Sequence, residues 1–271
     1  SSISQVLNKP PLKLLDRVQQ PVNFGNAKVS GKGRVEVLLK SNLTSDEITY
    51  EVKGTAKEFS SHVINPDFII SNGTLDFFAD KKGLEIKGNA KVKDLPIQAK
   101  LLGSLAKEEP KFLEIDFSLS EKVLEMLPDG FPEIKISGSA PAKLYLKFLE
   151  SKKVEFDLVS DLKGVELSYL PIGWVKEMNG EAELKVSGTI GNEFVLNNVY
   201  LISSSLALVG SAVQQKDENF MFNFEKLALE DVFDIQLVIE KDGVLEVTGG
   251  ELDMQEFIKL PLAKNSSKKP T

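Results

Sequence analysis

The sequence predicts a mostly β protein, in which a long antiparallel meander curves into an open groove and only a few short helices occur. Three observations predict this fold class: apolar and polar residues alternate along most of the chain, turn-forming residues interrupt the alternation, and glycines recur on its apolar side. Successive strand side chains point to opposite faces, so each stretch predicts a strand with one apolar face. A closed β-sandwich or barrel is the alternative architecture.

The stretch GLEIKGNAKVKDLPIQAKL, residues 83–101, contains two such strands. Apolar residues take even positions from Leu84 to Val92 and odd positions from Leu95 to Leu101. The phase changes at Asp94. A turn between neighbouring strands at this point would keep both apolar sets on one side of the sheet.

The same alternation continues along the chain and predicts roughly fifteen strands joined by short turns, which is typical of an antiparallel meander. Its longest run, EIKISGSAPAKLYLKF, covers residues 133–148. Ordinary strands have about 5 or 6 residues, so this run predicts either one very long strand or a strand bent by a bulge.

Helix signals are few. They cover residues 9–18, residues 120–127 with Ser120 as the expected N-cap, and the MQEFIKL stretch near the end. We expect a single β-groove domain over residues 1–263, with sheet segments at about 20–119 and 133–254 joined by a short helix near 120–127. Residues 264–271 are expected to form a polar tail or linker. So few helices cannot cover the apolar faces of the strands. The apolar face must therefore pack against another part of the sheet or be left for a partner.

A short glycine motif recurs along the chain, and its glycine takes a position on the apolar side of the alternating pattern. Examples are VKGTA around Gly54, IKGNA around Gly88, ISGSA around Gly138 and VSGTI around Gly188. Glycine inside a strand often marks a bend or the close approach of another group. The glycines could therefore let the sheet bend, leave space for a ligand along it, or do both.

The composition disfavours several functions. The chain has 40 acidic and 33 basic residues, a net charge of -7, and no cysteine. A general electrostatic grip on nucleic acid needs a basic face, and disulfide or thiolate chemistry needs cysteine. The one histidine, His62, lies between a serine and a valine, and carboxylates such as Glu85 and Glu183 occupy the polar parity of strands. We therefore expect a protein that is not an enzyme and has no metal or cofactor.

The closing stretch GVLEVTGGELDMQEFIKLP, residues 243–261, resembles the final motif of AsmA-like domains in the YhdP branch. It consists of a strand, glycines and a Leu-Asp pair that leads into a short helix. The alternating stretch VSGKGRVEVLLKSNLTSDEITYEVKGTAKEF, residues 29–59, is also similar to that family. The likeness covers about residues 29–260.

This resemblance implies a repeating β-groove that shields phospholipid acyl chains during transport between the inner and outer membranes of Gram-negative bacteria. The expected location is the periplasm, as part of an inner-membrane-anchored protein, and this chain would be a segment or a small member of the family. Expected partners are a phospholipid or other acyl lipid, a membrane through regions outside this chain, and other groove segments through edge strands. A non-catalytic β-sandwich scaffold or protein-binding module is the alternative.

The candidate lipid-binding residues share the apolar parity of the predicted strands. They are Val35, Val37, Tyr50, Val52, Phe77, Leu84, Ile86, Ile97, Ile136, Leu144, Leu146, Phe156, Leu158, Leu184, Val186 and Leu208.

Overall fold

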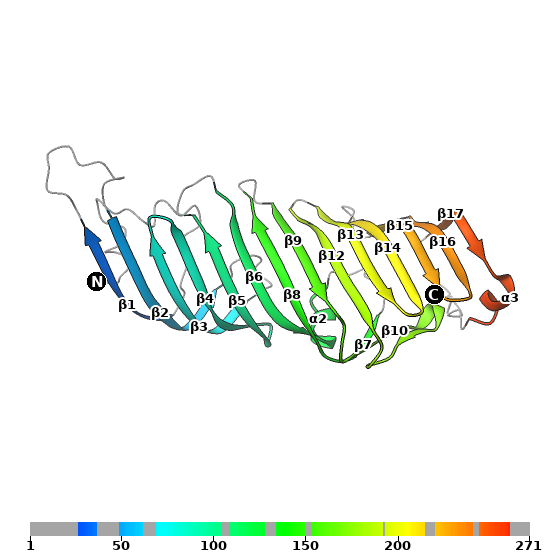
Figure 1. The fold of residues 1–271 in the computed structure, drawn as a ribbon, viewed down its shortest axis with the longest axis horizontal. Coiled ribbons are helices and arrows are strands. Elements are labelled where there is room, and N and C mark those ends of the chain that lie inside the picture. Colours follow the sequence, from blue (N-terminus) through cyan, green and yellow to red (C-terminus); the bar gives the residue numbers. More distant parts are fainter. Residues whose placement is uncertain are drawn as a thin grey trace, which may run out of the picture. The chain divides into compact units, whose positions relative to one another are not determined.

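A computed structural model describes residues 27–36, 49–61, 69–104, 109–127, 134–149, 153–191, 193–214, 220–240 and 244–260 (Figure 1). It confirms a mostly β fold built on an antiparallel meander. Fourteen strands form one sheet in the order β1-β2-β3-β4-β5-β6-β8-β9-β12-β13-β14-β15-β16-β17. Since β1 and β17 each have one neighbour in this order, the sheet of described strands is open and is not a closed barrel.

The chain divides into two compact units, which we describe separately. Unit 1 comprises Ser1–Phe117 with Tyr145–Val154, and unit 2 comprises Ser118–Leu144 with Glu155–Thr271. The short helix α2 (Glu121–Leu124) lies where the sequence predicts a junction between sheet segments, with Ser120 at its N-cap. The predicted helix at residues 9–18 and the predicted tail at 264–271 lie outside the described residues.

Unit 1 is built on consecutive antiparallel hairpins. The turn between the fourth and fifth strands places Lys93 and Asp94 at positive φ (44° and 65°), as a two-residue hairpin turn with the matching twist requires. Val92 pairs with Leu95 across this turn, so the phase change at Asp94 is confirmed as a turn. The strands are β1 (Lys28–Glu36), β2 (Thr49–Ser61), β3 (Ile70–Asp80), β4 (Gly83–Val92), β5 (Leu95–Gly103) and β6 (Lys111–Leu119), the last ending in unit 2.

Unit 2 contains the second run of hairpins and a separate three-stranded sheet. The strands β8 (Ala140–Phe148) and β9 (Val154–Ser160) contribute residues to both units. The main-sheet strands that follow are β12 (Ala182–Ile190), β13 (Phe194–Ser203), β14 (Leu206–Gln214), β15 (Phe220–Leu229), β16 (Phe233–Ile239) and β17 (Leu245–Leu252). The small sheet has the order β11-β10-β7, from β7 (Lys135–Gly138), β10 (Val165–Tyr169) and β11 (Trp174–Lys176), with a 3-10 turn η2 (Leu170–Ile172) between the last two.

The small sheet continues three neighbouring strands of the main sheet past a sharp corner. β7 leads into β8, β9 leads into β10 and β11 leads into β12, and both sheets keep this order. The backbone turns at Gly138, Leu162 and Gly164, whose φ values are 85°, 52° and 91°. We call β7, β10, η2 and β11 the flap. The long alternation at residues 133–148 is therefore one strand path with a bend, as the second of the two sequence alternatives predicts.

Hydrogen bonds hold this corner together. The backbone N–H of Ser139 donates to the Gly164 carbonyl at 3.1 Å. The Lys176 amino group donates to the carbonyls of Leu162 at 2.6 Å and Val165 at 2.8 Å. These carbonyls lie where the strands turn from one sheet into the other, and a buried carbonyl without a donor is costly. Lys176 supplies the donors and is itself only 3% exposed.

The last described element is the short helix α3 (Met254–Phe257), which agrees with the predicted helix at MQEFIKL. The Asp253 carboxylate caps it, accepting hydrogen bonds from the backbone N–H groups of Gln255 at 2.8 Å and Glu256 at 3.1 Å. An aspartate N-cap satisfies donors that a helix start leaves unpaired. Within the described part of the chain, no helix has the length and apolar character needed to cross a membrane.

Candidate functional site

Strand register brings the apolar residues of unit 1 onto one face of its sheet. Val52 is opposite Ala79, Phe77 is opposite Ile86, and Ile86 is opposite Leu101. The outermost pair on this face is Val35 with Tyr50. Directly opposite residues share a face, so these side chains form one continuous apolar surface across neighbouring strands.

This apolar face of unit 1 is only partly buried. Ile97 is buried near the β4–β5 turn, whereas Val52, Phe77, Leu84 and Ile86 are half-buried. Among the residues described for unit 1, no helix and no second sheet lies over the face. A sheet with one apolar face normally buries it against another layer, so an unlayered face of this kind is suited to a partner.

The motif glycine Gly54 lies on this face, and the space above it is occupied. A Cβ at Gly54 would lie 2.6 Å from Cζ of Phe77 and would collide with the Ser30 carbonyl of the neighbouring strand. The glycine therefore permits close approach of β1 and packing of the Phe77 ring. At Gly54 the geometry shows the close approach of neighbouring atoms, and an aromatic ring fills the space that the ligand explanation of the motif would leave open.

In unit 2 the apolar residues also share one face. Leu184 is opposite Leu201, Leu201 is opposite Leu208, and Leu208 is opposite Leu227. Val186 lies on the same face, opposite Val199. Most of these side chains are half-buried.

A chain of phenylalanine rings crosses this face of unit 2. Phe156 stacks on Phe194 with centroids 5.8 Å apart, and Phe194 meets Phe220 edge-on at 6.1 Å. Phe220, Phe222 and Phe224 then stack along β15 at 5.8 and 5.9 Å. Of these five residues, the sequence analysis selected only Phe156. Phe194 was missed because the pairing shifts register between Leu196 and Val199, which breaks the alternation that marks an inward residue.

The flap places a second layer over part of unit 2. Its Val165, Leu167 and Trp174 side chains are buried. The Trp174 indole N–H donates to the hydroxyl of Ser205, in the β13–β14 turn, at 3.2 Å. In Figure 1, β7 and β10 lie near the ends of β12 to β14, in agreement with this bond. Burial also raises the pKa of the Tyr169 phenol at the flap's outer end.

The candidate residues fall into three groups. The expected position of Ile136 on the main sheet is corrected. Ile136 pairs with Leu167 in the flap, because the strand bends at Gly138. Val37 lies outside the described residues. The others lie on main-sheet strands: Val35, Tyr50, Val52, Phe77, Leu84, Ile86, Ile97, Leu144, Leu146, Phe156, Leu158, Leu184, Val186 and Leu208.

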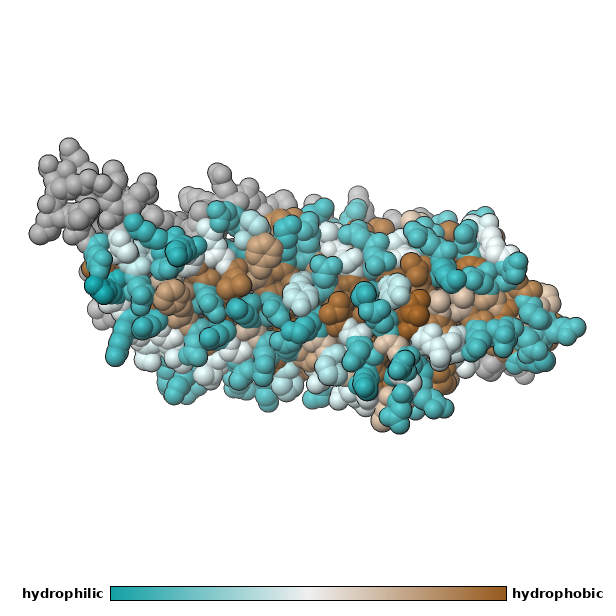
Figure 2. All heavy atoms as spheres, in the orientation of Figure 1, coloured by the Kyte–Doolittle hydropathy of each residue, from teal (hydrophilic) through white to brown (hydrophobic). Residues whose placement is uncertain are grey.

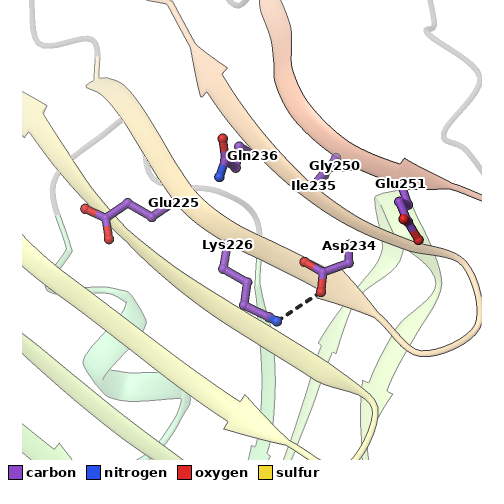
Figure 3. A pocket seen from close by; sticks show the side chains of 7 residues that line it. All are labelled: Glu225, Lys226, Asp234, Ile235, Gln236, Gly250 and Glu251. Carbon is purple, nitrogen blue, oxygen red and sulfur yellow. Dashed lines mark hydrogen bonds and ion pairs between the residues drawn. The ribbon is translucent and has the colours of Figure 1, made fainter.

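A polar pocket lies on the opposite face of unit 2, where register shifts interrupt β15, β16 and β17 (Figure 3). The Lys226 amino group pairs with the Asp234 carboxylate at 2.9 Å, and both side chains are about half exposed. Exposed ion pairs are worth about 0–1 kcal/mol. Glu225, Gln236 and Glu251 complete the polar lining. Across the ranges that the structure describes, no three His, Cys, Asp or Glu side chains are grouped to hold a metal ion.

Hydrophobic residues reach the surface over both units and lie among hydrophilic ones (Figure 2). The fold and this surface define a class of protein: an antiparallel meander with one apolar face, incompletely covered by other described elements. No protein-family model, no curated protein and no solved structure matches the chain.

Proposed function

We propose that the chain is a non-catalytic, lipid-binding β-groove segment whose apolar face shields phospholipid acyl chains. The observation that carries this proposal is the half-buried apolar face of unit 1, where Val52, Phe77, Leu84 and Ile86 lie in register on neighbouring strands. An acyl chain gains about 0.8 kcal/mol for each buried methylene. Such a face can hold an acyl chain through contact area alone, without specific polar groups.

The proposed setting is the periplasm of a Gram-negative bacterium, where the segment carries lipid between the inner and outer membranes. This part rests on the resemblance of residues 29–59 and 243–261 to AsmA-like domains. In this setting the chain belongs to a protein anchored in the inner membrane, and its membrane contact through that anchor is made by regions outside this chain.

The edge strand β17 supports pairing with a neighbouring groove segment. Its Leu245, Val247 and Leu252 side chains face the apolar side, opposite Ile239, Leu237 and Phe233, and are strongly exposed. Edge strands with exposed apolar residues readily pair with another strand. An added antiparallel strand would cover these side chains and extend the apolar face.

A protein-binding scaffold is the second candidate, and the flap is the observation that favours it. Over part of unit 2 the apolar face already has a protein layer, held by Trp174 and Ser205. A protein partner could complete that layer as a sandwich.

Native mass spectrometry after gentle purification tests the two candidates. The lipid proposal predicts a protein that carries phospholipid, or takes it up from phosphatidylcholine vesicles. A protein that stays lipid-free under both conditions contradicts the proposal and leaves the scaffold.

A further inference from the structure

The outer end of the flap is a hairpin without charge. From Leu167 to Val175 no residue is charged, in a chain in which 27% of residues are. The connection between β10 and β11 consists of the η2 turn and Gly173, whose N–H bonds back to the Leu170 carbonyl at 3.0 Å. The tip is therefore a compact, convex and apolar structure.

The two sides of this hairpin differ in what they contact. The inward side holds Leu167 and Trp174, which are buried. The outward side and the tip present Val175 at 47% exposure and Leu170 at 54% exposure, and Ile172 between them is half-buried. The inward side thus fixes the hairpin to unit 2, and its apolar tip stays in contact with solvent.

Among the described residues of the flap, charged side chains lie behind the tip. Lys135 of β7 lies beside Ser168, in the same cross-strand row as Val175, and is exposed. Glu166, the nearest acidic residue on β10, lies two residues further from the tip and pairs with Ser137. An apolar tip with a lysine directly behind it matches a bilayer interface, where apolar side chains enter the acyl region and long basic side chains reach the phosphates.

A flat protein partner fits this tip less well. A stable protein interface buries about 800 Å² on each partner. A four-residue turn with Leu170 exposed in it and Val175 exposed beside it on β11 cannot supply such an area. A bilayer has no such requirement, because it deforms around a convex apolar tip. The shape and the missing charges therefore favour a lipid surface over a protein.

We propose that the tip of the β10–β11 hairpin docks on the surface of a phospholipid bilayer. This inference rests on the proposed function, because a segment that carries lipid must meet the membrane from which lipid is taken or to which it is delivered. Docking through Leu170 and Val175 would make that contact at the flap of unit 2.

Vesicle flotation tests the docking, with the full chain and phosphatidylcholine vesicles. The wild type floats with the vesicles, and the double variant Leu170→Asp, Val175→Asp floats at least tenfold less. Phe112→Asp is the matched control, because Phe112 is 49% exposed on β6 and lies far from the hairpin in sequence; this variant floats like the wild type. Emission from Trp174, the one tryptophan of the chain, checks that the double variant keeps its flap.

Three outcomes overturn the docking: a wild type that does not float, a double variant that floats like the wild type, or a wild-type dimer in sedimentation that the double variant abolishes. The dimer would assign the tip to a second copy of the chain. Native mass spectrometry of the same samples separates this inference from the proposed function. A double variant that retains lipid but does not float supports docking at the tip. A wild type that floats but carries no lipid contradicts the proposed lipid carriage and leaves the docking intact.

Discussion

The ring of Phe156 lies over Gly188 of the neighbouring strand and leaves no room for a side chain there. A Cβ at Gly188 would lie 2.8 Å from both Cε1 and Cζ of Phe156, and would also collide with the Val195 carbonyl. Phe156 in turn stacks on Phe194. Because residue 188 has no side chain, the Phe156 ring of β9 can lie over it and form the first ring of the phenylalanine row.

Gly188→Ala is therefore expected to destabilise the protein. The added methyl group must displace the Phe156 ring and the backbone of β13, and overpacking of this kind costs about 1–3 kcal/mol. Urea denaturation measures the loss. Gly33→Ala is the control, since a Cβ there would meet its nearest atoms at an ordinary 3.7 Å. Equal losses in the two variants would contradict the close-approach explanation.

Two substitutions on the apolar face of unit 1 should separate lipid binding from folding. Ile86→Asp changes a half-buried side chain, so the charge stays hydrated and the fold persists, but lipid carriage falls. Ile97→Asp buries a carboxylate at a position that is 7% exposed, and we expect it to unfold the chain. Circular dichroism and native mass spectrometry report the two effects. If Ile86→Asp unfolded the chain as completely as Ile97→Asp, the face would be a dry core.

The buried amino group of Lys176 should make stability depend on alkaline pH. Burial lowers the pKa of Lys176 below its ordinary 10.5, and the negative charge of Asp161 opposes this change. Between the lowered pKa and 10.5 the unfolded chain binds more protons at this site than the folded chain. The free energy of unfolding contributed by Lys176 therefore rises with pH across this window.

Denaturation of wild type and Lys176→Gln over a pH series ending near 10.5 measures this contribution. The stability of the wild type relative to the variant is expected to rise with pH, because its buried charge is lost. A relative stability that falls over the same range contradicts a lowered pKa.

Trp174→Phe should loosen the flap by a small amount. The substitution keeps most of the apolar ring and removes the indole N–H that donates to Ser205. One neutral hydrogen bond contributes about 0.5–1.5 kcal/mol, so we expect a loss of about 1 kcal/mol. Circular dichroism in urea provides the measurement, and the variant Ser205→Ala should give a similar loss. A loss from only one of the two variants would show that the bond does not hold the flap.

The alternation of residues predicted most of the main sheet, because side-chain parity is a local property. It located the turn at Lys93–Asp94 and the face shared by Ile86 and Leu101, both of which the register confirms. The separate helix signal at MQEFIKL predicted the helix that Asp253 caps.

The flap could not be predicted in the same way. Apolar and polar residues keep alternating through the corner where the chain passes from the main sheet into the flap, so the alternation does not mark the change of sheet. Ile136 keeps the alternation of its neighbours, but the positive φ at Gly138 moves it beside Leu167 in the flap. Register shifts similarly hid Phe194. Both misses arise from backbone geometry that depends on tertiary contacts.

Photo-crosslinking from residue 86 tests the central claim most directly. A photoreactive amino acid replaces Ile86, on the apolar face of β4, and the control replaces Lys87, the next residue and on the opposite face. Both proteins are mixed with phosphatidylcholine vesicles, irradiated and analysed by mass spectrometry. Lipid adducts at position 86 that exceed those at position 87 are the predicted result. Crosslinks from position 86 only to protein, or equal lipid adducts at both positions, would contradict an acyl-binding face.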